Sequence, residues 1–433
     1  KMSLKIDISR KLIFSAPINS ATEKWGVYAI PRLWREPDGG LVVRFNGEQD
    51  TAFTEKINQA PNLYFLSRDN GNSWEKVADG ESIYDIHMLL GIGSPYLRLK
   101  SGEIIAFRGK SGLLPIKGIS PRKRFCMPNG EAVVHTYKYG DIPAEAKGLE
   151  RIYYKSENYE PVINESIIDF NEREVFVNAE ASYENEEYIP IPEYIQPFIF
   201  KNPYISGLTE LNDGTIVALT FGQNPSVCDR YCPVVYMLQS ADKGLSWQLR
   251  GTVASSADEV PYGYSGDGNE ASLAVAENGD LLCAMRMDMS INPDVAKPIC
   301  DTMLAVSHDC GFTWEKPFSA ADSSVTPHIV ALDNGILILI YGRPGVHFKI
   351  SEDNGKSWSE PHSIIGLTLE EERQNGKSDA QSKYFDTSSY SNTFVEKISG
   401  DTVAVVYNDM KHVDTDGKNH KAGFVGLITV KRV

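Results

Sequence analysis

A glutamate and an arginine are spaced so that one hairpin would bring them together. Glu270 opens a short apolar run, and Arg286 closes the next one, 16 residues later. The turn Glu277-Asn-Gly279 lies between the two runs, which we therefore expect to pair as antiparallel strands. Both side chains would reach the same edge of the sheet, where a carboxylate can accept a proton and a guanidinium can bind an anion. The simpler interpretation is a surface ion pair.

The elements that carry such residues are repeated along the chain. The sequence Ser-x-Asp-x-Gly-x-(Ser/Thr)-Trp occurs at 67–74, 240–247, 307–314 and 351–358. In each copy the Asp can accept hydrogen bonds from the backbone N–H groups ahead of it, and the Gly supplies a position with φ > 0. The Trp buries a large apolar ring. Because each copy follows a short apolar run, it is predicted to join two strands of a hairpin.

A second repeat consists of a glycine turn followed by a strongly apolar strand. Its glycines are 63, 112, 65, 56 and 65 residues apart, and they are Gly39, Gly102, Gly214, Gly279, Gly335 and Gly400. Steps near sixty residues with one long exception predict six units and one insertion. A unit of this length with two hairpins has four strands, which is the size of a propeller blade.

The expected fold is therefore all-β, a six-bladed β-propeller with four-stranded blades. Residues 1–433 are interpreted as one propeller domain with an insertion within about 115–195. The N-terminal strand, 4–14, is expected to pair with the C-terminal one, 423–430, since such closure removes exposed sheet edges.

The repeated turn resembles the Asp-box (BNR repeat) of the sialidase, or neuraminidase, superfamily, whose fold is a six-bladed propeller. The resemblance covers most of residues 15–430 and implies that the boxes are structural turns on the rim of the blades, away from the catalytic mouth. It also implies a retaining exo-glycoside hydrolase that releases a terminal acidic sugar, sialic acid or another 2-keto acid sugar, from glycans.

In this family a tyrosine is the nucleophile, and Tyr390, in Ser388-Ser-Tyr-Ser391, is similar to it. A phenol has a pKa near 10 and is a poor nucleophile alone, so a neighbouring carboxylate must take its proton. The resemblance gives that role to Glu270. A neutral tyrosine suits a substrate that is itself an anion at the reacting carbon, which a second carboxylate would repel. A packing role is the alternative for Tyr390.

The family grips the substrate carboxylate with three arginines, and the resemblance assigns two of these roles to Arg286 and Arg343. The first arginine departs from the pattern, because Ala29 stands where it is expected and Arg32 follows three places later. Residues three apart in one strand face opposite sides, so Arg32 would need a bulge near Pro31 to take that role. The chain is thus similar to a divergent member that lacks the usual first arginine.

The acid/base is expected to be an Asp in the loop after the second strand of the first blade, and Asp50 is the nearest candidate. A solvated loop residue is the other interpretation of Asp50. Two other functions stay open: a glycan-binding propeller without catalysis, and a hydrolase of this fold that acts on a neutral sugar.

The composition narrows the classes of partner. The net charge of −15 argues against binding to nucleic acid or to an anionic membrane. The sequence contains no run of 18 apolar residues, so no membrane-spanning helix is predicted. The six cysteines lack the spacing of a zinc site, so we expect neither a metal nor a cofactor. If Met2 is the original start, a cytoplasmic location is expected; otherwise a signal has been removed from a secreted or periplasmic protein.

Overall fold

The computed structural model describes residues 3–22, 27–29, 31–36, 38–47, 60–79, 96–109, 114–115, 123–126, 133–141, 149–154, 161–169, 174–179, 183–184, 187–188, 194–195, 206–223, 233–255, 270–286, 301–321, 325–342, 345–366, 371 and 393–433. The elements within these ranges are β-strands and one 3-10 turn, η1 (Tyr139–Asp141). The predicted all-β class is confirmed. The chain divides into two compact units, one of Lys1–Gly93, Ala276–Gly279 and Ala320–Val433, the other of Ser94–Val275 and Asp280–Ser319.

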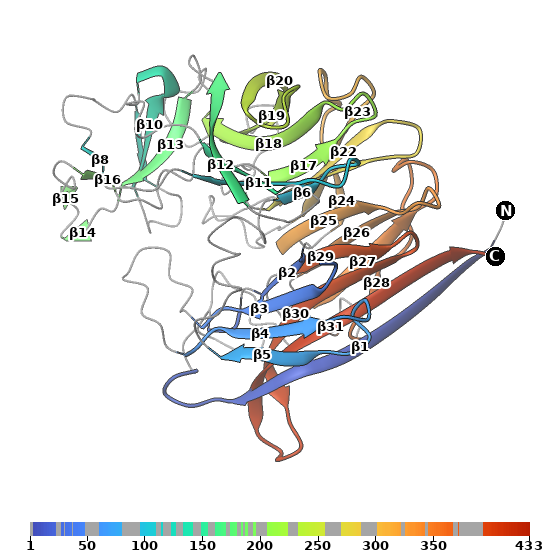
Figure 1. Ribbon diagram of the computed structural model, residues 1–433. Helices are drawn as coiled ribbons and strands as arrows, with labels where there is room; N and C mark the ends of the chain where they lie inside the picture. The colour runs from blue at the N-terminus through green and yellow to red at the C-terminus, as the bar shows by residue number, and fades with distance from the viewer. Residues whose placement is uncertain are drawn as a thin grey trace. The chain divides into compact units, whose positions relative to one another are not determined.

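The first unit contains three antiparallel sheets of four strands each, blue and orange to red in Figure 1. In the order of pairing, they are β2 (Pro31–Arg35), β3 (Leu41–Phe45), β4 (Leu63–Ser67) and β5 (Glu75–Asp79); β25 (Val325–Ala331), β26 (Leu337–Gly342), β27 (Val346–Ser351) and β28 (His362–Ser363); and β29 (Phe394–Ser399), β30 (Thr402–Val413), β31 (Asn419–Arg432) and β1 (Leu4–Pro17).

The two ends of the chain share the third of these sheets. Strand β1 pairs antiparallel with β31 along its whole length, from Leu4 opposite Arg432 to Pro17 opposite His420. Figure 1 accordingly shows the N- and C-termini next to each other. The predicted pairing of the terminal strands is confirmed.

The second unit is centred on two sheets. One has the four strands β21 (Ala271–Val275), β22 (Leu281–Arg286), β23 (Thr302–Ser307) and β24 (Phe318–Ala321). The other has eleven strands and contains two antiparallel sets of four, namely β6 (Tyr96–Arg98), β7 (Ile104–Gly109), β11 (Leu149–Tyr154) and β12 (Pro161–Asp169), and β17 (Ser206–Glu210), β18 (Ile216–Gln223), β19 (Pro233–Ser240) and β20 (Ser246–Ser255). The outer strands of the two sets, β12 and β20, pair in parallel.

The range predicted as an insertion holds most of the remaining strands. The large sheet continues through β13 (Glu174–Ala179), β10 (Val133–Lys138) and β9 (Lys123–Cys126), and two short pairs are formed by β14 (Tyr183–Glu184) with β15 (Glu187–Tyr188) and β8 (Leu114–Pro115) with β16 (Tyr194–Ile195). The same range also contains β11 and β12, which are part of a four-strand set. Extra segments therefore lie both before β11 and after β12.

Each of the six repeated glycines lies between the first and second strands of one four-strand set. Five of them have φ between +77° and +94°, which Gly adopts without the Cβ penalty. The turns share a backbone hydrogen bond, such as that from the N–H of Gly279 to the carbonyl of Ala276 at 2.9 Å. The sixty-residue repeat in the sequence therefore corresponds to one four-strand set.

The four Ser-x-Asp-x-Gly turns join the third and fourth strands of four sets and share one hydrogen-bond pattern. In the copy at 307–314, the Ser307 hydroxyl donates to Asp309 Oδ1 at 2.8 Å and accepts from the N–H of Gly311 at 2.7 Å. The Thr313 hydroxyl donates to Asp309 Oδ2 at 2.6 Å, and the Thr313 N–H donates to Oδ1 at 2.8 Å. These bonds, that of the Thr313 hydroxyl foremost, lower the pKa of Asp309 to about 2. The expectation that this Asp accepts bonds from the chain ahead of it is confirmed.

The residue before each of these glycines also has positive φ, which the sequence pattern did not predict. The four are Asn70, Lys243, Cys310 and Asn354, with φ between +55° and +62°. Three of the Trp indoles donate to the carbonyl of the glycine, whereas Trp247 donates to the hydroxyl of Ser166 on β12 at 3.0 Å. The parallel strand thus replaces the usual partner in that copy.

Within each unit, neighbouring sheets pack face to face. Ile338 and Ile340 of β26 lie in one buried cluster with Val403 and Val405 of β30. In the second unit, Leu219 of β18 shares a cluster with residues of β21 and β22. The middle strands of these sheets, such as β22 and β26, are buried on both faces. Their near-continuous apolar runs follow from this, since each buried aliphatic side chain contributes about 1.5–3 kcal/mol to folding stability.

Candidate functional site

The Glu270–Arg286 pair forms as the hairpin spacing predicts. Strands β21 and β22 pair with Ala271 opposite Met285, which places Glu270 and Arg286 one step further at the open end of the hairpin. The Arg286 N–H donates to the carbonyl of Glu270 at 3.3 Å. The Arg286 Nη1 lies 2.6 and 2.7 Å from the two carboxylate oxygens of Glu270. The hairpin therefore brings together a base and a cation that lie 16 residues apart.

This pair is largely removed from solvent. The exposed fractions of the two side chains are 16% for Arg286 and 12% for Glu270. The pair is thus partly buried, and the interpretation of a surface ion pair stays open. An arginine in this place fixes the direction of the carboxylate, so Glu270 is oriented to accept a hydrogen bond.

Arg32 lies on the first strand of its sheet, in a setting that differs from the prediction. Strand β2 begins at Pro31, and Ala29 lies before it, in the buried turn that contains Tyr28 with φ +64°. The assumption that Ala29 and Arg32 share one strand and face opposite sides is therefore wrong. The Arg32 guanidinium lies 4.1 Å from the ring centre of Phe394 on β29, a cation–π contact worth about 0.5–2 kcal/mol.

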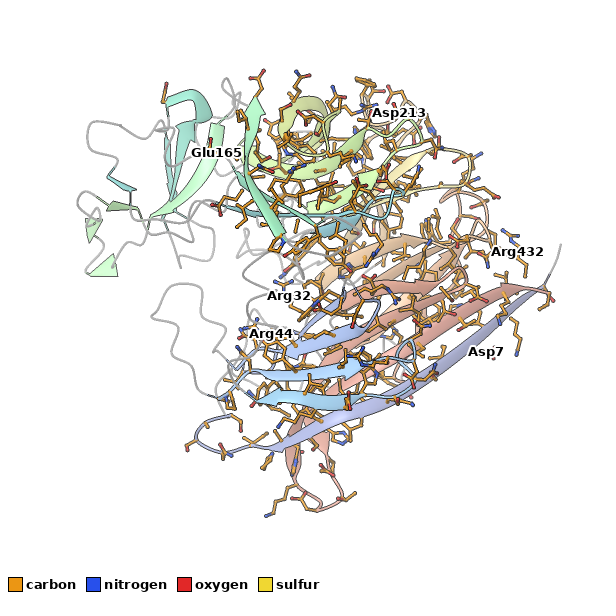
Figure 2. All side chains as sticks on the ribbon, viewed as in Figure 1. Asp7, Arg32, Arg44, Glu165, Asp213 and Arg432 are labelled. Atoms are coloured by element: carbon orange, nitrogen blue, oxygen red, sulfur yellow. The ribbon has the colours of Figure 1, made fainter. Side chains whose placement is uncertain are left out.

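Arg44, which the sequence reasoning missed, lies directly opposite Arg32 in the β2–β3 ladder. Figure 2 labels both arginines on this sheet. The Arg44 Nη2 donates to Asn46 Oδ1 at 3.3 Å, and its Nε is buried and makes no hydrogen bond within the described part of the chain. Like charges directly opposite each other destabilise a sheet. One signal was available, because Arg44 is the single charged residue in the apolar run Leu41–Phe45.

Three of the predicted site residues, Tyr390, Arg343 and Asp50, lie outside the described residues. The chain enters the described part again three residues after Tyr390, at Thr393, which is fully buried immediately before β29. Arg35 lies at the other end of β2. Its Nη1 donates to the carbonyl of Gly39 in the glycine turn at 2.9 Å.

Antiparallel pairing separates these residues from the Ser-x-Asp-x-Gly turns. Glu270 and Arg286 lie at the start of β21 and the end of β22, whereas the turn at 307–314 joins β23 to β24 at the other end of that sheet. Arg32 is similarly at the opposite end of its sheet from the turn at 67–74. Within each sheet, the candidate residues and the turns therefore occupy opposite ends.

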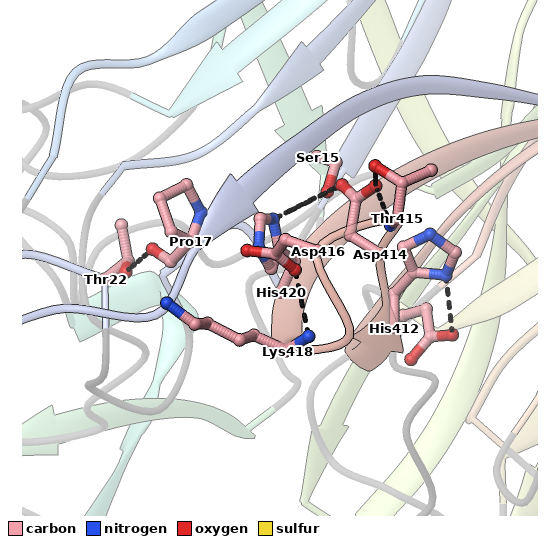
Figure 3. Close-up of polar contacts among 10 residues, drawn as sticks. Ser15, Pro17, Thr22, His412, Asp414, Thr415, Asp416, Lys418 and His420 are labelled. Carbon is pink, nitrogen blue, oxygen red and sulfur yellow. Dashed lines mark hydrogen bonds and ion pairs between the residues drawn. The ribbon is translucent and has the colours of Figure 1, made fainter.

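A further polar cluster joins β1 to the tip of the β30–β31 hairpin (Figure 3). The Ser15 Oγ lies 2.9 Å from His420 Nδ1, and His420 Nε2 lies 3.1 Å from Asp416 Oδ2. A serine in contact with a histidine that in turn contacts an aspartate is also the arrangement of a serine nucleophile with its base and acid. The Ser15 hydroxyl also contacts the carboxylate of Asp414, which competes for its proton. The cluster therefore fastens the hairpin to β1.

No group of three or more His, Cys, Asp or Glu side chains in the described ranges is placed to hold a metal ion. Helices of the length and apolarity that a membrane span requires are likewise absent from this part of the chain.

Comparisons with known proteins bear on the fold. No protein-family model matches the sequence, and no curated protein matches it. The chain is similar to a protein of unknown function from Dyadobacter fermentans, with 15% identity and a TM-score of 0.53 over 96% of this chain and 98% of that one. It also aligns with NanB sialidase from Streptococcus pneumoniae (12% identity, TM-score 0.45, 96% of this chain and 70% of that one) and with the α-L-arabinofuranosidase arb93a from Fusarium graminearum (11%, 0.43, 96% and 97%). The first likeness shows a shared fold, and the other two carry no argument about this chain.

Proposed function

We propose that this protein is a retaining exo-glycoside hydrolase of sialidase type that releases a terminal acidic sugar from a glycan. The proposed architecture is a six-bladed propeller in which each four-strand set is one blade and the Ser-x-Asp-x-Gly turns are Asp-boxes. Within the described residues, six four-strand sets, each with a glycine turn between its first and second strands, support this architecture.

The observation that carries the proposal is the Glu270–Arg286 pair. A hydrolase of this type requires a carboxylate that is held in place to take the proton of a tyrosine nucleophile. The Arg286 guanidinium, 2.6 Å from Glu270 in a partly buried setting, holds the Glu270 carboxylate in one orientation. An arginine carries several N–H donors on its planar fork, and Arg286 is proposed both to orient Glu270 and to bind the carboxylate of a substrate.

The other roles follow from the sequence resemblance. Tyr390 is proposed as the nucleophile and Asp50 as the acid/base, with Arg343 in the substrate-carboxylate clamp. Arg32 is the proposed third member of that clamp, because it lies near the start of β2 and carries its charge beside Phe394. Losing one partner of a desolvated charge pair costs about 2–5 kcal/mol, so the substitution at Ala29 favours a substrate related to, but different from, the usual sialic acid.

A hydrolase of a neutral sugar is the second candidate, and one observation favours it. Arg286 is already bonded to both oxygens of Glu270, and an arginine engaged in this way needs no substrate carboxylate to balance its charge.

A panel of fluorogenic substrates tests these functions. The purified protein is incubated with α-ketosides of acidic 2-keto sugars and with neutral glycosides, and the released fluorophore is measured. Turnover of the acidic substrates is expected. Turnover of neutral glycosides alone would establish the second candidate, and binding of acidic sugars without turnover would establish a glycan-binding protein.

Two variants test the assignment of roles. Tyr390→Phe removes only the phenolic oxygen, and Glu270→Gln keeps the shape of the side chain but removes the base. Each is expected to lower kcat by about two to four orders of magnitude, and the double variant should be little worse than the worse single one. A fluorinated 2-keto sugar should leave a covalent mass on the peptide with Tyr390. Full additivity of the two losses, or no label, would contradict these roles.

A further inference from the structure

Strand β1 has one long unpaired edge. It is the last strand of its sheet, and among the described strands it pairs with β31 alone (Figure 1). The strand has 14 residues, and along its other side no described strand bonds to its backbone N–H and C=O groups. Such an edge is a template for pairing with a further strand, and proteins usually shorten, interrupt or cover it. This edge is therefore a candidate interaction surface.

The ladder between β1 and β31 decides which residues of β1 face this edge. Ser3 and Val433 exchange both of their backbone hydrogen bonds, at 3.1 and 2.9 Å, which identifies them as a hydrogen-bonded pair. The register continues without a shift from Leu4 to Leu12, so the odd-numbered residues of this stretch bond to β31. The even-numbered residues direct their N–H and C=O groups toward the open edge, and they are Leu4, Ile6, Ile8, Arg10 and Leu12.

Two apolar side chains of this even-numbered set remain exposed. Ile8 is 40% exposed and Leu12 is 45% exposed. Arg10 lies between them in the sequence, but its guanidinium is 4.1 Å from the ring centre of Phe424 on β31 and so lies over its own sheet. Charged side chains commonly protect an edge by projecting into the path of a partner strand. Arg10 does not act in this way, and the edge stays accessible to a strand with apolar side chains.

We propose that two copies of this chain associate through β1, which pairs antiparallel with β1 of the second copy about a two-fold axis at Ser9. In this register Asp7 of each copy lies opposite Lys11 of the other, on the solvent-facing side, and opposite charges that face each other stabilise a strand pair. Ile6 lies opposite Leu12 of the second copy and covers its exposed side chain. The inference is independent of the proposed function, because β1 carries none of the residues assigned to catalysis or to substrate binding.

The charges on β1 disfavour the adjacent registers. An axis at Asp7 would place the two Asp7 side chains opposite each other, and an axis at Ile8 would place Lys5 opposite Lys11, which is repulsive in both cases. With the axis at Ser9, four even-numbered residues of each copy, Ile6 to Leu12, pair with one another and gain their outward backbone hydrogen bonds. The interface uses the same surface of both copies, as a two-fold dimer requires.

A cysteine cross-link tests the position of the axis. Ser9 bonds to β31, so across the dimer the two Ser9 residues form a non-hydrogen-bonded pair, whose Cα atoms are about 4.5 Å apart and within disulfide range. Mild oxidation of Ser9→Cys should join two copies through residue 9, as identified by peptide mass spectrometry. Lys5→Cys is the matched control, because its side chain is 61% exposed but the two copies would be roughly 27 Å apart. Cross-linking of Ser9→Cys no greater than that of Lys5→Cys would overturn this axis.

Sedimentation equilibrium measures the association itself. The wild type should show a concentration-dependent equilibrium between monomer and dimer. Asp7→Lys faces Lys11 of the second copy and should raise the Kd of the dimer by at least about tenfold, whereas Asp7→Lys combined with Lys11→Asp should return Kd to within about threefold of the wild type.

Lys5→Glu is the matched control for these charge changes. It breaks the same 3.0 Å ion pair between Lys5 and Asp7 that Asp7→Lys breaks, but in the dimer it faces Ile13, so Kd should stay within about threefold of the wild type. Wild-type protein that sediments as a monomer at every concentration would overturn the proposal. A dimer whose Kd is the same in all of these variants would also overturn it, because the interface would then lie elsewhere.

Discussion

The Glu270–Arg286 pair gives the sharpest test of the structure, because its geometry sets the size of the effect. Exposed ion pairs contribute about 0–1 kcal/mol, whereas removal of one partner of a buried pair costs about 3–5 kcal/mol. With exposed fractions of 12% and 16% and contacts at 2.6 and 2.7 Å, this pair lies nearer the buried limit. We expect a coupling free energy of about 1.5–3 kcal/mol between the two side chains.

A double-mutant cycle measures this coupling. The free energy of unfolding is determined by urea denaturation for the wild type, Glu270→Gln, Arg286→Met and the double variant. The matched control is the same cycle on Lys5 and Asp7, whose side chains are 61% and 56% exposed at 3.0 Å. That control should couple by less than about 0.5 kcal/mol. Additive losses at Glu270 and Arg286, within about 0.5 kcal/mol, would refute the coupling of this partly buried pair and with it the observation that carries the proposed function.

Two further predictions concern stability. His308 lies 2.9 Å from Asp280 and 3.2 Å from Glu315, and these hydrogen bonds, that of Asp280 foremost, raise its pKa. The contribution of His308 to folding stability is therefore complete below pH 6.5 and is lost as pH rises through the folded pKa. Tm of the wild type should exceed that of His308→Gln by more at pH 5.5 than at pH 8.5, and an equal difference at both pH values would contradict the bonds. Gly244 and Gly214 both have φ above +80°, but a Cβ at Gly244 would lie 2.4 Å from the Phe107 ring and one at Gly214 would meet nothing within 4 Å. In urea denaturation, Gly244→Ala should lower the free energy of unfolding by about 1–3 kcal/mol more than Gly214→Ala does. Equal losses in the two variants would contradict that packing.

Local chemistry made much of the fold predictable from the sequence. The Ser-x-Asp-x-Gly-x-(Ser/Thr)-Trp turn is closed by bonds among its own residues, so its eight positions carry the information that specifies it. The spacing of Glu270 and Arg286 could likewise be interpreted, because the length of a hairpin decides which residues end at the same edge. The terminal strands were predictable for a different reason, since an unpaired edge strand is costly wherever it occurs.

Contacts between distant residues were not predictable in this way. The Thr326–Thr393 bonds join residues 67 apart, and neither threonine stands out in the sequence. The orientation of Arg32 relative to Ala29 was misjudged because a turn before Pro31 decides where β2 begins. The alternation of side chains between the two faces of a strand does not apply to residues before that point. The insertion was located only as a range, since its strands are short and one of them pairs with a partner far along the chain, as Glu174 of β13 does with Gln223 of β18.

Within each sheet, the division between its two ends explains why the repeat is so evident in the sequence while the chemistry is not. The turns at one end share a set of internal hydrogen bonds, and the pKa of Asp69 and of Asp309 falls to about 2 because the Ser73 and Thr313 hydroxyls, foremost among several donors, stabilise the carboxylates. Such turns need the same residues in every copy. The opposite ends carry a partly buried ion pair in one unit, and in the other an arginine opposite an arginine and Thr326 with a φ of +45°. Within the described residues these features are not part of the repeat. A residue that is costly where it stands and is not part of a repeat is a candidate for a functional role, and on this contrast we propose that the function lies at those ends.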